Sequence, residues 1–218
     1  MSSKISKHYD EKYFHWQTSI GEFGGWANQT KFAGYISSRA DVLDFGCGGG
    51  FLLKEIQCNK KVGVEINPSA AETARKNGIE VFKCVDDIPD EYVDVVISNN
   101  VLEHTLQPLE ELKSIYRKLR KGGKIIFVVP CESISYGYLP NDINHHLYSW
   151  SPMCLGNLFT EAGFSVIEVK PYIHKWPPQY RFITKVGGRQ LFEIACRIYG
   201  RIERSWFQVR VIGDKENA

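Results

Sequence analysis

The sequence predicts an α/β fold in which a mostly parallel sheet is covered by helices on both faces. From residue 41 onward, short runs rich in β-branched and aromatic residues alternate with stretches of helical periodicity. The first run, VLDF, passes into a loop with four glycines in the five positions 46–50. In open parallel sheets the loop after the first strand lies where ligands bind. The same stretch therefore predicts both the fold class and the location of a site.

Composition limits the classes of partner. The chain has 218 residues, 43% of them hydrophobic, which is enough for one sizeable core and little for two. A formal charge of +2 gives no large field toward nucleic acid or an anionic membrane, so we expect a small-molecule partner. The six cysteines form no C-x-x-C pair, which predicts a reduced, cytoplasmic protein without a zinc site. No apolar run reaches the roughly 18 residues that span a bilayer, so no membrane insertion is expected. The oligomeric state is not predicted.

The elements follow in order along the chain. Five parallel strands are expected, followed by an antiparallel pair that closes the sheet: residues 41–45, 61–66, 80–85, 93–98 and 124–129, then 165–169 and 206–212. Proline at a helix start and glycine after its end mark the helices between them. These helices are expected over residues 51–57, 68–76, 108–119, 151–162 and 191–202.

The chain before residue 41 has a different character. It is rich in aromatic residues without strand alternation, namely Tyr9, Tyr13, Phe14, Trp16, Phe23, Trp26 and Phe32. We expect residues 1–40 to form a helical, aromatic-rich cap, either over a cleft or as ordinary packing on the core. Residues 41–218 then form the main domain. Segments 131–150 and 171–205 are expected to be insertions that cover the cleft.

Three interpretations of the glycine loop compete. A phosphate-binding NTPase loop needs G-x-x-x-x-G-K-[ST], and the residues after Gly46 read CGGGFLL, which excludes it. A dinucleotide fingerprint G-x-G-x-x-G places its third glycine at Phe51, so that match is partial. The pattern D-x-G-x-G-x-G, which begins at Asp44 and ends at Gly50, fits better.

A carboxylate accompanies this pattern. Glu65 ends the second predicted strand, 19 residues beyond Gly46. A carboxylate in this position accepts hydrogen bonds from both hydroxyls of a ribose. The alternative is a solvated acid at the end of a strand. With the glycine loop beside it, Glu65 predicts a ribose-containing ligand.

Four stretches, in order, resemble class I S-adenosylmethionine-dependent methyltransferases of the ubiquinone-biosynthesis-like and polysaccharide-cluster branch: VLDFGCGGGFLLKEI, VGVEINPSAAETARKNG, DVVISNNVLEHTLQPLEELKSIYRKLRKGGKIIFVVP and HHLYSWSPMCLGNLFTEAGF. The resemblance covers roughly residues 40–170. It implies a Rossmann-like, seven-stranded, mostly parallel sheet with helices on both faces and the last strand antiparallel. It also implies S-adenosyl-L-methionine as cofactor and S-adenosyl-L-homocysteine as product.

Carried over residue by residue, the resemblance gives each part of the cofactor a partner. The glycine loop would hold the methionyl part, Glu65 the ribose, and Asp86 or Asp87 with Ile88 the adenine. The chain departs from the usual pattern where Cys84-Val85 replaces a Gly-Asp pair at the end of the third strand. The expected cofactor-binding residues are Asp44, Gly46, Cys47, Gly48, Gly50, Glu65, Ile66, Asp86, Asp87, Ile88 and Asn99.

The implied reaction is methyl transfer to a small-molecule acceptor, and a hydroxyl of a sugar or a phenolic natural product is the favoured class. N- or C-methylation, an NAD-linked oxidoreductase and a catalytically silent binding protein are the alternatives. Base methylation of nucleic acid is disfavoured, because Asn99-Asn100-Val101-Leu102 lacks the [DNS]-P-P-[YF] motif.

A hydroxyl acceptor needs a general base, for which histidine is the best suited residue. We expect His145 or His146 in the loop after the fifth strand to take the proton, and His104 to serve in positioning. No metal site is expected, because no acids and histidines have ligand spacing in the sequence.

Overall fold

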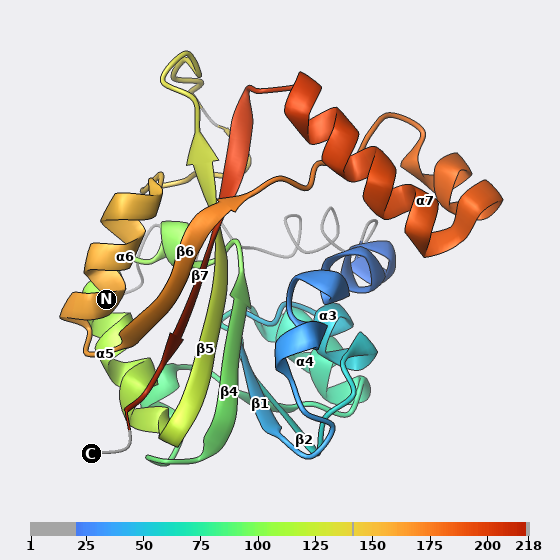
Figure 1. Cartoon of the computed structure of the whole chain (residues 1–218). Coiled ribbons are helices and arrows are strands. Elements are labelled where there is room, and N and C mark those ends of the chain that lie inside the picture. Colours follow the sequence, from blue (N-terminus) through green and yellow to red (C-terminus); the bar gives the residue numbers. More distant parts are fainter. Residues whose placement is uncertain (1–20, 141, 217–218) are drawn as a thin grey trace.

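The computed structural model describes residues 21–140 and 142–216. A central seven-stranded sheet has α5 and α6 on one face and α3 and α4 on the other (Figure 1). The strands are β1 (Asp41–Phe45), β2 (Lys60–Val64), β3 (Glu80–Phe82), β4 (Val93–Asn99), β5 (Leu119–Glu132), β6 (Ser165–Tyr172) and β7 (Trp206–Asp214). The helices are α3 (Phe51–Glu55), α4 (Pro68–Lys76), α5 (Pro108–Lys118), α6 (Pro152–Glu161) and α7 (Tyr180–Ile202). The predicted fold class is confirmed.

The sheet order is β3-β2-β1-β4-β5-β7-β6. β1 pairs in parallel with both β2 and β4, so the chain changes direction across the sheet at β1 and β4. β7 runs antiparallel to its neighbours β5 and β6, as expected for the closing pair. Ligands in such sheets lie at the carboxyl ends of the strands beside the switch point. The glycine loop follows β1 at this place.

Apolar residues of alternate strand positions fill two cores, one on each face of the sheet. Phe45 and Phe127 stack on the face covered by α5 and α6, with ring centroids 6.1 Å apart. Val42 and Ile126 point to the other face, toward α3 and α4. Prolines open α4, α5 and α6, and Asn67 caps α4 by accepting the amide protons of two of its first residues. Local sequence signals and burial therefore agree along most of the sheet.

Several predicted strand boundaries were wrong, including the end of the second strand, which stops at Val64 so that Glu65 follows it. The third strand stops at Phe82, because residues 85–87 turn into a short 3-10 helix. The fifth strand begins at Leu119 instead of residue 124. Residues 121–123 (KGG), whose glycines were expected to close the predicted helix 108–119, therefore belong to the strand. The Gly122 amide donates a hydrogen bond to the Lys215 carbonyl and the Gly123 carbonyl accepts one from the Lys215 amide, and this tertiary pairing outweighs the local helix-stop signal.

The C-terminal insertion also differs from expectation. Residues 180–190 were predicted as loop, yet α7 begins at Tyr180 and runs for 23 residues. It kinks at Gly188, which has a φ of 59° that side-chain-bearing residues rarely adopt. Among the described residues, no helix is long and apolar enough to cross a membrane. Segment 131–150 was predicted as loop, but residues 131 and 132 belong to β5; the described residues of 133–150 form no helix or strand.

Residues 21–28 are helical and pack against the C-terminal insertion. The ring of Phe23 lies 5.1 Å from Trp176, 4.7 Å from Tyr180 and 5.5 Å from Phe192, centroid to centroid. Two segments far apart in sequence are thus joined by aromatic packing. The other predicted cap residues Tyr9, Tyr13, Phe14 and Trp16 lie outside the described residues, and the division of the chain at residue 40 stays a proposal.

Candidate functional site

The glycine loop makes a tight turn between β1 and α3. Gly46, Gly48 and Gly50 have φ values of 77°, 53° and 76°, which glycine adopts without strain. A Cβ on Gly46 would lie 2.4 Å from the Val101 side chain. The first glycine is therefore required by both conformation and packing.

Glu65 ties the end of β2 to this loop. Its Oε2 accepts the amide proton of Gly48 at 2.9 Å and its Oε1 accepts that of Asn67 at 2.7 Å. Burial raises the pKa of Glu65, and these amide hydrogen bonds oppose the increase. Each carboxylate oxygen has a further lone pair, so the group retains capacity to accept hydrogen bonds from a ligand.

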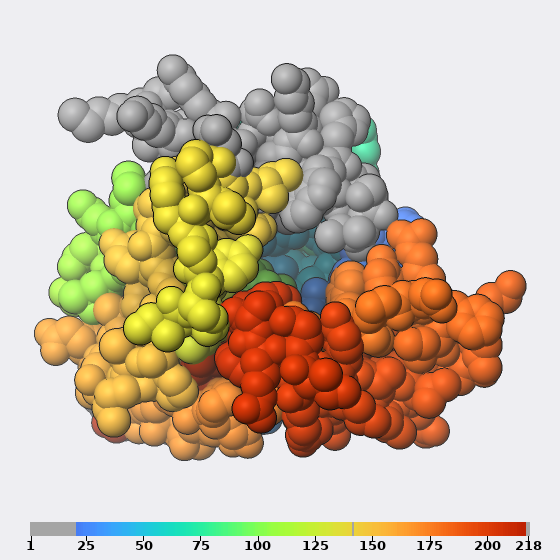
Figure 2. Space-filling model, turned by 90° about the horizontal axis from the view of Figure 1, so that it is seen from above, coloured from blue at the N-terminus to red at the C-terminus, as the bar shows by residue number. Residues whose placement is uncertain are grey.

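Two cavities lie at the carboxyl ends of the strands. The larger, of about 700 Å³, is lined by the glycine loop, residues 21–31, the ends of β4 and β5, the 133–150 loop and α7. The smaller, of about 510 Å³, is lined by the ends of β1 and β2, residues 83–85 and residues 100–107. Both include Gly46, Asn100 and His104, so they meet at these residues. Figure 2 looks into the hollow between the loop in yellow and the C-terminal part of α7 in red.

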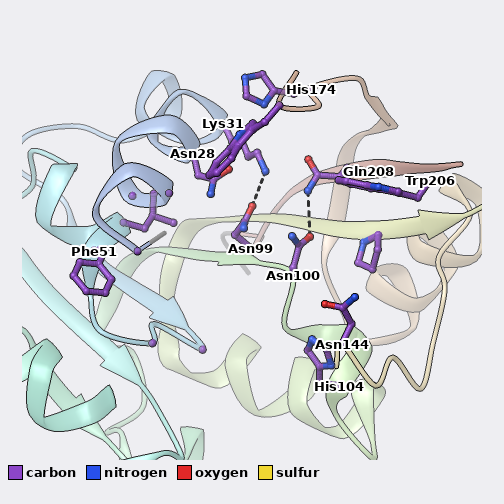
Figure 3. A pocket seen from close by; sticks show the side chains of 18 of the residues that line it. Asn28, Lys31, Phe51, Asn99, Asn100, His104, Asn144, His174, Trp206 and Gln208 are labelled. Atoms are coloured by element: carbon purple, nitrogen blue, oxygen red, sulfur yellow. Dashed lines mark hydrogen bonds between the residues drawn. The ribbon is translucent and has the colours of Figure 1, made fainter. Parts of the chain in front are cut away.

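A buried lysine projects into the larger cavity. Lys31 is 2% exposed, and its Nζ donates to Oδ1 of Asn99 at 2.9 Å (Figure 3). Burial lowers the pKa of Lys31 to about 7, although the charge of Glu193 opposes the decrease. Asp44 also lines this cavity, and its burial raises its pKa well above the usual range. The cavity therefore has a poorly solvated amine suited to an anionic group.

The smaller cavity has exposed apolar walls. Ile66 is 46% exposed and Leu106 is 61% exposed, and both line it together with Cys84 and Val85. Two large aliphatic side chains beside a carboxylate make a slot suited to a flat ring attached to a polar group.

The structure brings most of the predicted cofactor residues together. Those that line the larger cavity are Asp44, Gly46, Cys47, Gly48 and Asn99, and those that line the smaller are Gly46, Glu65 and Ile66. Gly50 lines neither cavity and instead stands at the N-cap position of α3.

The residues predicted for adenine lie elsewhere. Asp86 accepts hydrogen bonds from Ser114 and Arg117. Ile88 is 2% exposed in the core, and neither it nor Asp87 lines a cavity. The 3-10 turn that replaces the end of the third strand directs these residues away from the cavity.

The predicted histidines separate into two groups. His104 and His146 both line the larger cavity, with ring centroids 5.0 Å apart. Nδ1 of His146 lies 2.6 Å from Oε1 of Glu132, which orients its ring. His145 is exposed, lies outside both cavities and has a φ of 49°. Of the neighbouring pair, only His146 faces the site.

Sequence reasoning missed three contributors to the site. Lys31 belongs to no motif. Its position in the aromatic-rich segment 1–40 was the only indication in the sequence that it could lie near a site. Glu103 precedes His104 in the LEH segment and is 0% exposed. Burial raises the pKa of Glu103 to about 8. Glu132 and His146 are brought into contact by the return of the loop, which no local pattern predicts.

Glu103, His104 and His146 also form a compact group. Each offers one ligand-type atom, and these atoms all lie within 4.8 Å of one another. His146 is 42 residues from His104 in the sequence, so the spacing considered from sequence could not reveal this group.

Comparisons with known proteins agree with this geometry. Residues 22–169 match the family model described as a methyltransferase domain. An uncharacterized methyltransferase of Schizosaccharomyces pombe is 36% identical over 109 residues, which are 44% of this chain and 41% of the relative. The ribosomal protein L11 methyltransferase of Ralstonia pickettii is 34% identical over 93 residues, 39% of this chain and 30% of the relative. The matches thus span less than half of each curated relative.

Solved structures share the fold over nearly the whole chain. A chain in the complex of the Haloferax volcanii Trm112 methyltransferase activator with a methyltransferase superposes with a TM-score of 0.69 at 18% identity, covering 98% of both chains. An S-adenosylmethionine-dependent methyltransferase from Thermotoga maritima gives a TM-score of 0.65 at 17% identity, covering 97% of this chain and all of that one.

The family match includes the glycine loop, Glu65 and the LEH segment. It favours methyl transfer over the NAD-linked oxidoreductase that the glycine pattern alone left open. The chain belongs to the methyltransferase-domain family, and it has the fold of the S-adenosylmethionine-dependent methyltransferase on which it superposes.

Proposed function

We propose that this enzyme transfers the methyl group of S-adenosylmethionine to a hydroxyl oxygen of a small molecule held in the larger cavity. The observation that carries the proposal is the meeting of the two cavities at Gly46, Asn100 and His104, with His146 and Glu132 on the acceptor side. A cofactor that spans both cavities has its reactive centre at this junction. An acceptor in the remaining space then lies beside the two histidines.

The residues fit the cofactor. Glu65 would accept hydrogen bonds from the ribose hydroxyls, and Ile66 and Leu106, which line the same cavity, would pack against the adenine. Gly46 and Gly48 line the larger cavity, and their backbone without side chains would let the methionyl chain approach closely. Lys31 pairs with the α-carboxylate, which supplies the negative charge that its buried amine lacks. These assignments replace Asp86, Asp87 and Ile88 as the adenine partners.

The cofactor supplies an electrophilic methyl group on a positively charged sulfur. The protein's contribution is alignment in a cleft from which water is largely excluded. An acceptor hydroxyl would have to lose its proton as its oxygen takes the methyl group. His146, held by Glu132, and His104 are the titratable groups placed to handle that proton. His145 has no part in the site.

The larger cavity suits a polar acceptor with a ring. Its walls include His174, Trp176 and Trp206, and the amide of Gln208 donates to Oδ1 of Asn100 at 3.3 Å (Figure 3). Aromatic walls with a few polar groups are typical of sugar and phenol sites. The six cysteines are all free thiols, which supports the proposed cytoplasmic location.

Transfer of label from methyl-labelled S-adenosylmethionine to a panel of sugars, phenols, amines and carbon acids tests the proposal. Oxygen methylation of a sugar or phenol is the expected result. Methylation confined to amines or carbon would replace the hydroxyl assignment with the N- or C-methyltransferase alternatives. Cofactor binding without turnover on any acceptor would favour the silent binding protein.

A further inference from the structure

We propose that Glu103, His104 and His146 bind a divalent transition-metal ion at the junction of the two cavities, and that this ion takes an acceptor with two adjacent oxygens. The proposal rests on the proposed methyl transfer only for the acceptor. The ligand set stands on the geometry alone. Oxygen and nitrogen atoms of the three side chains lie within 4.8 Å of one another.

The burial of Glu103 and its lack of hydrogen-bond partners support a metal site. Its side chain is fully buried, and among the described residues neither carboxylate oxygen has a hydrogen-bond partner. Nε2 of His104 lies 3.8 Å from Oε1 of Glu103, which is too far for a hydrogen bond. A buried carboxyl group without partners is costly, and such groups usually pair with a charge or coordinate a metal. The neighbouring histidines supply the other ligands that a metal would need.

The contact between His146 and Glu132 also supports a metal site. Nδ1 of His146 is paired with Glu132 at 2.6 Å, which leaves Nε2 as the nitrogen available to a ligand. Metal-binding histidines usually have their second nitrogen hydrogen-bonded to a carboxylate or carbonyl in this way. Ordinary packing of a surface histidine requires no such arrangement.

The ligand types indicate the class of metal. Two imidazoles and one carboxylate favour Zn²⁺, Fe²⁺, Co²⁺ or Mn²⁺ over Ca²⁺ or Mg²⁺, which prefer oxygen ligands. Three protein ligands leave coordination positions open to substrate. The side chains of His104 and His146 are 14% and 19% exposed and face the larger cavity, so the open positions point toward the acceptor.

This placement specifies the acceptor further. A metal at the junction would bind two neighbouring oxygens, as in a catechol or a vicinal diol of a sugar, and would lower the pKa of the attacking hydroxyl. The proton would then leave to water in the cavity, and the two histidines would serve as ligands instead of bases. A monohydric acceptor would bind the metal through one oxygen and would lack the second contact.

The test is metal binding by the full chain in the absence of cofactor and acceptor. Protein dialysed against a chelator is titrated with Co²⁺, followed by its visible absorption, and with Mn²⁺, followed by calorimetry. We expect one equivalent to bind, and Glu103→Gln and His146→Ala each to abolish this binding. Glu132→Gln should weaken it by about tenfold to a hundredfold. The matched control is His145→Ala, which alters the exposed neighbour and should bind as the parent does.

Absence of saturable binding would overturn the proposal. Binding that survives in both Glu103→Gln and His146→Ala would also overturn it, because the metal would then sit elsewhere. Far-UV circular dichroism of each variant identifies loss of fold, and His104→Ala provides a third, more accessible ligand change. These outcomes are independent of methyl transfer. A failed metal titration leaves the proposed function standing, and a failed transfer assay leaves the metal site standing.

Discussion

The carboxylate of Glu65 accepts the amide proton of Gly48 at 2.9 Å, which joins the end of β2 to the glycine loop. One residue thereby fixes the loop and presents a hydrogen-bond acceptor to the smaller cavity. Together with the hydrogen bonds that the Gly46 and Cys47 amides donate to the Val64 carbonyl, this contact sets the distance between the proposed ribose-binding and methionyl-binding residues.

Replacement of Glu65 by alanine should weaken S-adenosylmethionine binding by roughly 1.5–3 kcal/mol, the range for hydrogen bonds to a charged group. Calorimetric titration of the variant measures this loss. The matched control is Asp86→Ala, since Asp86 pairs with Ser114 and Arg117 outside the cavities and should leave affinity unchanged. If the two variants lose the same affinity for S-adenosylmethionine, the assignment of Glu65 to the ribose is wrong, and Glu65 is an acid at a strand end without a role in binding.

Gly48→Val should abolish binding of both S-adenosylmethionine and S-adenosylhomocysteine. Gly48 lines the larger cavity at a φ of 53°, where a branched side chain is strained and occupies ligand space. Gly34→Val is the control, because a Cβ at Gly34 meets nothing within 4 Å. Thermal melts separate loss of the site from loss of the fold. Retained affinity in a folded Gly48→Val protein would contradict the assignment of the loop.

Lys31 should make cofactor affinity depend on pH. In the free protein its pKa is lowered to about 7, so the amine is charged below pH 7 and largely neutral above it. A carboxylate bound beside it favours the charged form and raises that pKa. Affinity should therefore be full below pH 7 and should fall by up to about tenfold per unit as the pH rises above 7. Titrations between pH 6 and pH 9 measure the slope.

Two controls isolate this effect of Lys31. The α-amino group of the cofactor also titrates near pH 8, so the comparison is with Lys31→Met, which should bind more weakly below pH 7 and lose the slope due to lysine. S-methyl-5′-thioadenosine lacks the carboxylate, and its affinity for the parent protein should not change across this range. A slope that persists in Lys31→Met would assign the pH dependence to another group.

The neighbouring histidines should differ sharply in their effect on methyl transfer. His146 faces the larger cavity and is held by Glu132, whereas His145 is exposed and lies outside it. With an identified acceptor, His146→Ala should lower kcat/KM by about a hundredfold or more, the range for loss of a group that assists proton removal. His145→Ala should keep the parent value. The reverse ranking would show that the loop rearranges when substrate binds.

Much of this fold could be predicted because local and global signals agree. The strands around β1 follow from apolar runs, and the turn at Gly46 follows from a backbone conformation that few other residues adopt. Glu65 could be identified because a strand end fixes where its side chain lies. These are local properties of the chain.

The rest depended on contacts between distant segments. The salt-bridged pair of Glu132 and His146 forms only when the loop after β5 folds back, and Lys31 reaches Asn99 across 68 positions. Lys215 draws the KGG segment into β5 by tertiary pairing. No periodicity or helix cap in the sequence encodes such contacts. The proposed adenine-binding wall of the smaller cavity and the acceptor end of the larger cavity could therefore be identified only from the structure.

The most direct test of the account is a crystal structure of the enzyme with S-adenosylhomocysteine. We expect the ribose hydroxyls within hydrogen-bond distance of Glu65, the adenine between Ile66 and Leu106, and the sulfur directed at the junction beside His104. The carboxylate should lie on Lys31. An adenine bound outside the smaller cavity, or a sulfur facing away from His104 and His146, would contradict the proposed placement of cofactor and acceptor.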